Sequence, residues 1–280
     1  MNYLKILGAS GSKTKFTGTT SFQIYNDILV DAGNVINSLG DETLQINHIF
    51  LTHSHSDHII DLPFIVESFF EQRNKPLMVY GSKETLNSLR AHTFNNEIWP
   101  DFTKINLINS NKKALILKEM EPNETIKIGS YSLKAIKANH IPGSFGFVII
   151  KNHLNGYVIS GDTYENDDLW EEINNNNKIR SLIIECSFPS DMSKLAATSK
   201  HLTPKILKNG LKNLKRDNLQ IFIYHIKPIY QDRMIKEIKE YKILANGGKI
   251  LEEGDVIHID TGQIETNMIP HDKFERIMEI

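Results

Sequence analysis

Short runs of β-branched and aromatic residues alternate along the chain with stretches of helical pattern. The short runs predict strands and the longer stretches predict helices. Strands are expected at residues 4–7, 22–25, 28–30, 49–51, 77–80, 132–136, 147–150, 157–159, 182–184 and 220–224. Helices are expected at residues 57–72, 82–93, 166–173 and 203–214. This rhythm is typical of a mixed α/β protein.

The chain shows no sign of a break between domains. Its 280 residues, 40% hydrophobic and 24% charged, are enough for a well-buried core. Neither an internal repeat nor a proline-rich linker interrupts them. We therefore expect a single domain over residues 1–280.

Charge and cysteine content limit the classes of function. The 32 basic and 34 acidic residues leave a net charge of −2, without the basic excess of a duplex-binding protein, so no stable nucleic-acid partner is expected. The one cysteine, Cys186, excludes an internal disulfide, and the first residues lack the apolar core of an export signal. No apolar run approaches the roughly 18 residues that span a bilayer. We expect a cytoplasmic protein without a membrane role.

Three imidazoles and a carboxylate follow the predicted strand at 49–51, in the order H-x-H-x-D-H. They belong to His53, His55, Asp57 and His58. Strand ends display functional side chains on a rigid scaffold, so these four are expected to reach one cleft. Their residue types are those of a hydrolytic metal site, although such a site needs further ligands.

Three further candidate ligands also stand at the ends of predicted strands. His140 follows the strand at 132–136, Asp162 follows the strand at 157–159, and His225 follows the strand at 220–224. Each is ambiguous alone, because a single histidine is more often structural and a Gly-Asp-Thr sequence is more often a turn. Their common placement with the first cluster favours one shared metal site.

The order of these motifs, with an aspartate (Asp31) before them in LVDAG, resembles the metallo-β-lactamase superfamily across nearly the whole chain. Within that superfamily it is similar to the class II cyclic-nucleotide phosphodiesterases. Three stretches carry the narrower similarity, HTFNNEIWPDFTKI (92–105), KHLTPKIL (200–207) and HIKP (225–228). The resemblance implies an αββα sandwich, two mixed β-sheets flanked by helices, with a family-specific helical insert around residues 82–105.

The resemblance also implies two divalent metal ions at one edge of the sheets. One ion would be held by His53, His55 and His140, the other by Asp57, His58 and His225, with Asp162 bridging them. Asp31 would lie behind the ligands and orient one imidazole. A second and compatible role for Asp31 is the N-cap of a helix at residues 33–39. The ligand types favour Zn²⁺ and are compatible with Mn²⁺ or iron.

The implied activity is hydrolysis of 3',5'-cyclic nucleotides, cAMP and/or cGMP, to nucleoside 5'-monophosphates. Two cations about 3.5 to 4 Å apart can hold a bridging hydroxide that attacks phosphorus in line with the ribose 3'-oxygen. Asp57 would be a catalytic group as well as a ligand. The leaving oxygen needs a proton, which by resemblance Glu185 and His201 would supply as a carboxylate–imidazole pair. The alternative for His201 is a structural histidine at a helix start.

Other residues bear on substrate and partners. Four residues of the insert, His92, Asn95, Trp99 and Asp101, are candidates for the nucleotide pocket or a dimer contact. A packed lid with Trp99 as a core aromatic is the alternative. Lys227 in HIKP is a candidate phosphate contact. Asp61 stands where the resemblance leads us to expect a small residue. The partner expected is a small cyclic nucleotide, and the resemblance is compatible with a homodimer.

Two other functions fit the same motifs. A tRNA 3'-processing nuclease shares H-x-H-x-D-H and the Glu/His pair, but it should carry a flexible arm rich in glycine and basic residues, which the sequence lacks. A metal-binding sensor without turnover is the third alternative, and the complete ligand set argues against it. The sequence does not select among cAMP, cGMP and a cyclic dinucleotide.

Overall fold

The computed structural model describes residues 2–152, 154–244 and 246–266. Within them, one sheet has eight strands. In spatial order these are β14 (Gln263–Thr266), β13 (Asp255–His258), β1 (Tyr3–Gly8), β2 (Ser21–Tyr25), β3 (Ile28–Val30), β4 (His48–Phe50), β5 (Leu77–Gly81) and β6 (Leu115–Glu119). The sheet is mixed, because β3 to β6 are parallel and the pairs on the other side are antiparallel.

The second sheet has six strands in the described part of the chain. Its order is β12 (Gln220–Tyr224), β11 (Ile179–Glu185), β10 (Gly156–Ile159), β9 (Phe145–Lys151), β8 (Tyr131–Lys137) and β7 (Thr125–Ile128). The strands β10, β11 and β12 are parallel, so their carboxyl ends meet at one edge of the sheet. The other pairs are antiparallel.

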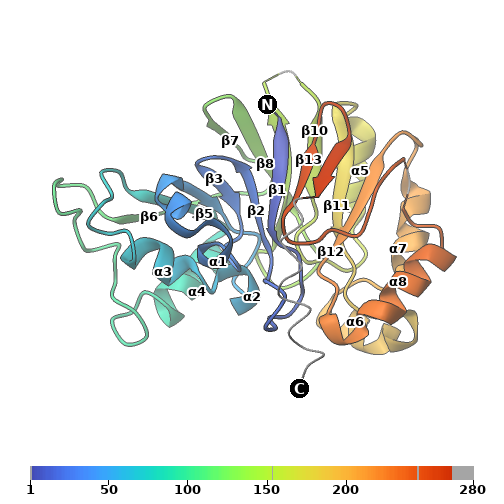
Figure 1. The fold of residues 1–280 in the computed structure, drawn as a ribbon, viewed down its shortest axis with the longest axis horizontal. Coiled ribbons are helices and arrows are strands. Elements are labelled where there is room, and N and C mark those ends of the chain that lie inside the picture. Colours follow the sequence, from blue (N-terminus) through green and yellow to red (C-terminus); the bar gives the residue numbers. More distant parts are fainter. Residues whose placement is uncertain (1, 153, 245, 267–280) are drawn as a thin grey trace, which may run out of the picture.

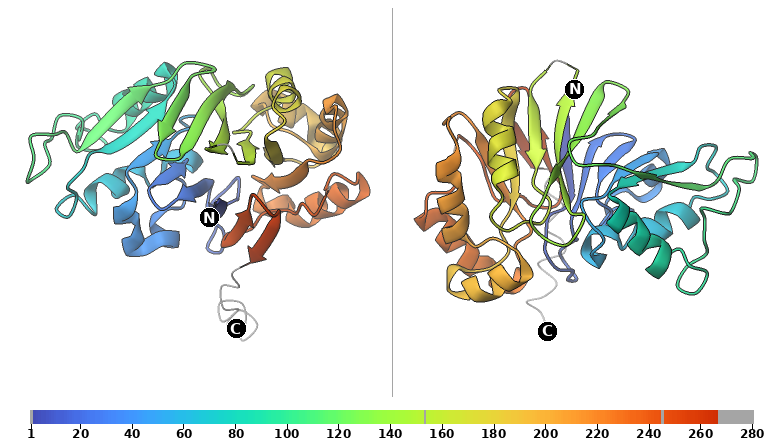
Figure 2. Two further views of the ribbon diagram at one scale, coloured as in Figure 1. Left: turned by 90° about the horizontal axis from the view of Figure 1, so that it is seen from above. Right: turned by 180° about the vertical axis from the view of Figure 1, so that it is seen from behind.

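Helices cover the outer face of each sheet (Figures 1 and 2). On the eight-stranded sheet they are α1 (Ile36–Leu39), α2 (Ser56–Ile59), α3 (Leu62–Glu67) and α4 (Lys83–His92). On the six-stranded side they are α5 (Asp167–Asn175), α6 (Ser193–Ser199), α7 (Pro204–Gly210) and α8 (Gln231–Glu240). Short 3-10 helices span Gly40–Gln45, Ser190–Met192, Leu211–Asn213 and Pro228–Tyr230. None of the described helices is both long and apolar enough to cross a membrane.

Three hydrophobic layers hold this sandwich together. The central layer joins the two sheets and includes Phe50 of β4 packed edge-on against Phe147 of β9, with ring centroids 5.7 Å apart. One outer layer packs α1, α3 and α4 on the eight-stranded sheet, and the other packs α5, α7 and α8 on the six-stranded sheet. This layering confirms the predicted αββα architecture.

All ten predicted strands are present, two of them with the predicted bounds. The strands β6, β7, β13 and β14 were not predicted. Of these, β7 and β14 lie at sheet edges, and two of the four residues of β7 and three of the four residues of β14 are exposed, so their apolar pattern is weak. The last residues of the predicted domain, 267–280, lie outside the described residues.

The predicted helix at 57–72 is wrong in its continuity. It is broken into α2 and α3 by a turn at Ile60–Asp61, and Pro63 lies in the first turn of α3, where a missing N–H is tolerated. The insert at 82–105 is helical only over α4, and residues 93–105 form bends and turns instead. The helix expected at 203–214 ends at Gly210 and continues as a 3-10 turn.

The N-cap role suggested for Asp31 is wrong, and Asp61 takes it instead. The helix α1 begins at Ile36, and its N-cap residue Val35 offers no side-chain cap. The Asp61 carboxylate accepts hydrogen bonds from the backbone N–H groups of Val35 at 2.6 Å and Ile36 at 2.9 Å. Asp61 therefore satisfies the free N–H groups at the start of a helix that is distant in sequence.

Candidate metal centre

The H-x-H-x-D-H segment starts in a loop that Asp31 holds in place. Both Asp31 and Thr52 follow neighbouring parallel strands, β3 and β4. One Asp31 oxygen accepts the Thr52 N–H at 2.8 Å, and the other accepts the Thr52 hydroxyl at 2.8 Å. The chain then leaves the sheet through His53 and enters α2 at Ser56, with His55 as the N-cap residue. The segment is thereby fixed before any ligand binds.

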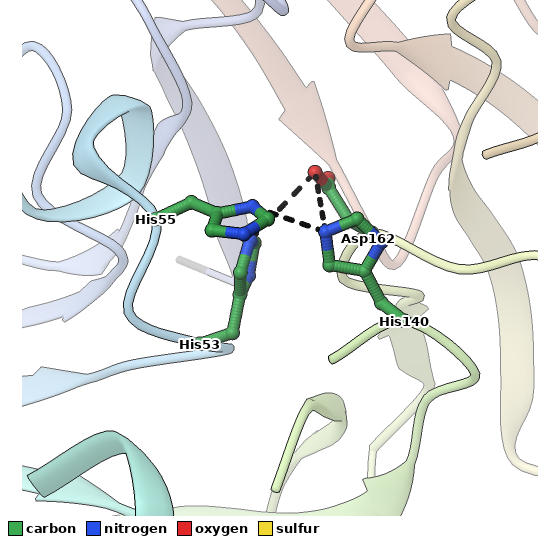
Figure 3. Close-up of side chains that lie close together, drawn as sticks. All are labelled: His53, His55, His140 and Asp162. Atoms are coloured by element: carbon green, nitrogen blue, oxygen red, sulfur yellow. Dashed lines mark hydrogen bonds and ion pairs between the residues drawn. The ribbon is translucent and has the colours of Figure 1, made fainter. Parts of the chain in front are cut away.

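The remaining candidate ligands come from the six-stranded sheet. His140 follows β8, Asp162 follows β10 and His225 follows β12 directly. Figure 3 shows His53 and His55 on one loop and His140 on another, with the imidazoles and the Asp162 carboxylate turned toward one another. Tertiary structure thus brings together all seven residues predicted as ligands, in groups of His53, His55, His140 and Asp162 and of Asp57, His58 and His225.

The first group surrounds a common point. The ligand atoms of its four residues lie within 4.8 Å of one another. His140 Nε2 is 3.1 Å from His55 Nδ1 and 4.0 Å from Asp162 Oδ2, and His53 Nε2 is 3.8 Å from the same oxygen. Nitrogen and carboxylate atoms at this spacing can share one cation.

The second group lies beside the first and contacts the same carboxylate. His58 Nε2 and His225 Nε2 are 3.3 Å apart, and Asp57 Oδ2 is 3.3 Å from His225 Nε2. Asp162 Oδ2 is 3.3 Å from His58 Nε2 and 3.2 Å from His225 Nε2. Asp162 is therefore positioned between the two groups, as a bridging ligand would be.

The facing nitrogens of the second group indicate that the cluster is built for cations. The Nδ1 atom of His58 lies 2.7 Å from the Asp31 carboxylate, and Nδ1 of His225 lies 2.9 Å from the Ser187 hydroxyl. When both Nδ1 atoms carry the proton, the two Nε2 lone pairs face each other, which is unfavourable unless a cation lies between them. Two buried ligand atoms, His53 Nε2 and Asp162 Oδ1, have no hydrogen-bond partner. A bound cation would satisfy them.

Electrostatics differ among the ligands: burial alone would lower the pKa of His58, but the Asp162 and Asp31 carboxylates raise it well above its ordinary value. Burial lowers the pKa of His53 well below its ordinary value and that of His140 to about 4, so both imidazoles are neutral and able to bind metal at neutral pH. Burial alone would raise the pKa of the Asp162 carboxyl, but His225, His58 and His53 together outweigh it and lower the pKa well below its ordinary value. Burial would raise the pKa of Asp57 as well, but His225 and His58, when protonated, outweigh this and lower it. Both carboxylates are ionised.

A second carboxylate–imidazole pair adjoins the cluster. Glu185 is the last residue of β11 and is fully buried. Its Oε1 accepts hydrogen bonds from His201 Nδ1 at 2.8 Å and from the Thr163 N–H at 3.1 Å. Burial lowers the pKa of His201, but the Glu185 charge and hydrogen bond outweigh it, so the pKa is raised. His201 Nδ1 is 3.9 Å from Asp162 Oδ2, which places this imidazole beside the metal cluster.

Other residues predicted for the substrate lie in different surroundings. His92 is the exposed last residue of α4, and the Asn95 side chain organises its own loop by donating to the Ala91 carbonyl and accepting from the N–H groups of Glu97 and Ile98. Trp99 packs against Phe64 at 5.1 Å, in agreement with the packed-lid alternative. A substrate contact by His92 or Asn95 stays a prediction.

Lys227 follows the predicted ligand His225 by two residues and lies near His201. Its ammonium group donates to the Gly11 carbonyl at 3.1 Å and stands 5.3 Å from the centre of the Phe188 ring, which in turn contacts His201. The predicted contact of Lys227 with a phosphate is compatible with this place and stays a prediction.

Sequence reasoning missed two hydroxyl groups in the site, those of Thr52 and Ser187. The Thr52 hydroxyl is 3.0 Å from His53 Nδ1, and the Ser187 hydroxyl is 2.9 Å from His225 Nδ1. Their positions in the sequence could have indicated these hydroxyls, because Thr52 directly precedes the predicted ligand His53 and Ser187 follows Glu185 by two residues. Side chains two positions apart along an extended segment share a face.

Comparison with known proteins assigns the chain to a family. A sequence model described as the anti-Pycsar protein Apyc1 matches residues 7–246. The chain belongs to the Apyc1 family. As a member of that family it is also similar to 3',5'-cyclic-nucleotide phosphodiesterase 1 of Saccharomyces cerevisiae, with 26% identity over 234 residues that cover 71% of this chain and 62% of the yeast protein.

Solved structures similar to this Apyc1-family protein confirm its fold. Unliganded yeast PDE1 superposes with a TM-score of 0.74 at 21% identity, covering 90% of this chain and 99% of that one. The metallo-β-lactamase fold protein YhfI from Bacillus subtilis gives a TM-score of 0.72 at 19% identity, covering 92% of this chain and 100% of that one. The chain therefore has the metallo-β-lactamase fold that was predicted from its sequence.

Proposed function

We propose that the protein hydrolyses 3',5'-cyclic nucleotides to nucleoside 5'-monophosphates. The observation that carries the proposal is the buried Glu185–His201 pair beside the two ligand groups, with His201 Nδ1 3.9 Å from Asp162 Oδ2. A metal cluster alone serves many hydrolases, whereas a proton donor next to it suits a poor leaving group such as a ribose alkoxide. The similarity to the yeast enzyme named as a cyclic-nucleotide phosphodiesterase supports this substrate class.

The residues would divide the metal-binding task as the geometry groups them. His53, His55 and His140 would hold one divalent ion, Asp57, His58 and His225 the other, and Asp162 would contact both. When bound, such ions neutralise phosphate oxygens and make water a better nucleophile. We propose Zn²⁺, because the donors are imidazoles and carboxylates, with Mn²⁺ or iron as alternatives. The buried thiol of Cys186 lies against the Leu202 carbonyl and belongs to neither ligand group.

The chain's own groups would move the protons. Asp57 keeps an ionised and partly exposed carboxylate 3.3 Å from His225 Nε2, and it would accept a proton from the attacking water. The bond from phosphorus to the ribose 3'-oxygen then breaks, and His201 would donate its proton to that oxygen. Glu185 would hold the imidazole in place throughout through the bond to Nδ1.

A cavity next to His140 offers room for the nucleoside. Its volume is about 450 Å³. Apolar groups of Met120, Pro122 and Pro142 and the lysines Lys83, Lys137 and Lys200 are among its lining residues. The carboxylates of Glu84 and Glu121 also line it, so the cavity offers both apolar surface and hydrogen-bonding groups to a ligand. We propose that the base and ribose occupy this cavity while the phosphate lies at the ligand groups.

Steady-state hydrolysis of cAMP and cGMP, with metal content measured on the same samples, tests the proposal. The wild-type protein should form 5'-monophosphates with metal bound. Asp162→Ala should reduce turnover to background because it removes the carboxylate shared by both groups, whereas Asp168→Ala on the exposed first turn of α5 should leave it unchanged. Metal-loaded wild-type protein that cleaves precursor tRNA but neither nucleotide would overturn the proposal. Light scattering on the same samples tests whether the protein forms a homodimer.

A further inference from the structure

The Ser187 hydroxyl joins the two halves of the site. Ser187 is fully buried, and its Oγ lies 2.8 Å from Glu185 Oε2 and 2.9 Å from His225 Nδ1. A longer contact of 3.3 Å reaches His201 Nδ1, which has its closer partner in Glu185. One hydroxyl thus connects Glu185, the partner of the proposed proton donor His201, to His225 of the second ligand group.

The number of hydrogens available decides which group donates and which accepts at the Ser187 hydroxyl. A serine hydroxyl has one hydrogen, and an ionised carboxylate can only accept. Ser187 therefore donates to Glu185 and accepts from His225, whose Nδ1 must carry the proton. In that tautomer the lone pair of His225 is on Nε2, the atom that lies 3.3 Å from Asp57 and 3.2 Å from Asp162. This is the form that a metal ion requires.

The other half of the site repeats the arrangement. Asp31 accepts directly from His58 Nδ1 at 2.7 Å. It also accepts from the Thr52 hydroxyl at 2.8 Å, and that hydroxyl lies 3.0 Å from His53 Nδ1. Each buried carboxylate therefore orients one imidazole directly and a second through a hydroxyl. The repetition on a different strand end argues that the Ser187 contact is part of the site's construction.

The backbone keeps Ser187 in this place. Its N–H donates to the Leu202 carbonyl at 3.1 Å, next in sequence to His201, and the His225 N–H donates to the Ala9 carbonyl at 2.7 Å. The hydroxyl is therefore held between segments that are themselves fixed. No large rearrangement is needed for it to act.

We propose that Ser187 is a positioning residue through which Glu185, the carboxylate that holds the proton donor His201 directly, also orients the metal ligand His225. The inference rests on the proposed metal-dependent function. It predicts that removal of the hydroxyl weakens metal binding at one site and spares the other, a pattern that a general loss of structure would not produce.

Titration of the metal-free protein with Zn²⁺ against a chromophoric chelator tests the inference. Ser187→Ala should weaken one of the two zinc sites by about 10- to 100-fold, the usual effect of losing a group that orients a ligand, while the other site keeps its affinity. Ser187→Thr retains the hydroxyl and should bind both ions like the wild type. Cys186→Ala, which alters the neighbouring buried side chain, is the matched packing control and should also bind both.

A double-mutant cycle adds a test of the route through Glu185. Glu185→Gln should weaken the same zinc site. Its effect should be smaller in the Ser187→Ala background than in the wild type, because both substitutions break the same chain of hydrogen bonds. The inference is overturned if Ser187→Ala binds both ions normally, if it loses both sites equally, or if Ser187→Thr is as weak as Ser187→Ala. Wild-type protein that binds two zinc ions but turns over no cyclic nucleotide would refute only the proposed function.

Discussion

At the scale of single residues, the site depends on which imidazoles are neutral and which are charged. His140 and His53 are kept neutral by burial, whereas His201 lies beside the Glu185 carboxylate, which raises its pKa. The same residue type is therefore suited to the proposed role of metal ligand in one place and to that of proton donor in another. The difference is the partner of Nδ1, a carbonyl oxygen for His140 and a carboxylate for His201.

The pH dependence of turnover should follow the protonation of His201. A proton donor is active while protonated, so kcat should fall as pH rises through the raised pKa of His201. In Glu185→Gln that pKa falls, and the alkaline limb of the kcat profile should move to lower pH, with a loss of about 10²- to 10⁴-fold at alkaline pH. The measurement is kcat against pH on zinc-saturated protein. A uniform decrease with an unmoved alkaline limb would contradict the role of the pair.

At the scale of elements, the short helix α1 depends on a carboxylate from the turn before α3. The Asp61 carboxylate accepts from the N–H groups of Val35 and Ile36. The Asp61 N–H in turn donates to the Ala32 carbonyl, so Asp61 also holds the segment that follows Asp31. Asp61 thus links the carboxyl end of β3 to the turn that follows α2. The residue that departs from the expected family pattern has a structural task.

Loss of this cap should be visible as loss of stability. Asp61→Ala leaves two buried or half-buried N–H groups without their acceptor, and we expect the free energy of unfolding to fall by about 1.5–3 kcal/mol, the range for hydrogen bonds to a charged group. Asp61→Asn keeps one acceptor oxygen and should lose less. Urea denaturation followed by circular dichroism measures both variants. Equal stability of wild type and Asp61→Ala would show that another group caps α1.

At the scale of the whole molecule, the ligand groups connect the two sheets. His53 and His55 follow β4 of the eight-stranded sheet, whereas His140 and Asp162 follow β8 and β10 of the six-stranded sheet. The second group likewise joins α2 to the end of β12. A bound ion would therefore cross-link the sheets at one edge of the central hydrophobic layer.

Removal of metal should consequently lower the stability of the whole fold. A ligand at 100 times its Kd stabilises the folded state by about 2.7 kcal/mol per site, so chelation should lower the Tm of the metal-loaded protein by several degrees. The Asp162→Ala variant, which loses the shared ligand, should show little response to the chelator. Differential scanning calorimetry with and without chelator measures the shift. Identical Tm values for the wild type in both conditions would contradict a cross-linking role for the metal.

The sequence by itself determined the elements with strong local patterns and the ligands that follow them. The strand β12 and the histidine after it were both readable, because a run of apolar β-branched and aromatic residues ends at a polar one. The edge strands β7 and β14 were not, because at least half of the residues in each are exposed and only pairing with a neighbour defines them. Local pattern also failed at Asp61, whose partners precede it by 26 and 25 residues.

Only the tertiary structure decided how the site residues are paired. H-x-H-x-D-H and the order of the later ligands are visible in the sequence, but the sharing of Glu185 between His201 and, through Ser187, His225 depends on contacts across 16 and 38 residues. A hydroxyl carries no sequence signal of its own, since its role depends on the two groups within 3 Å of it. Sequence determined which chemical groups are present, and packing determined which of them share a proton.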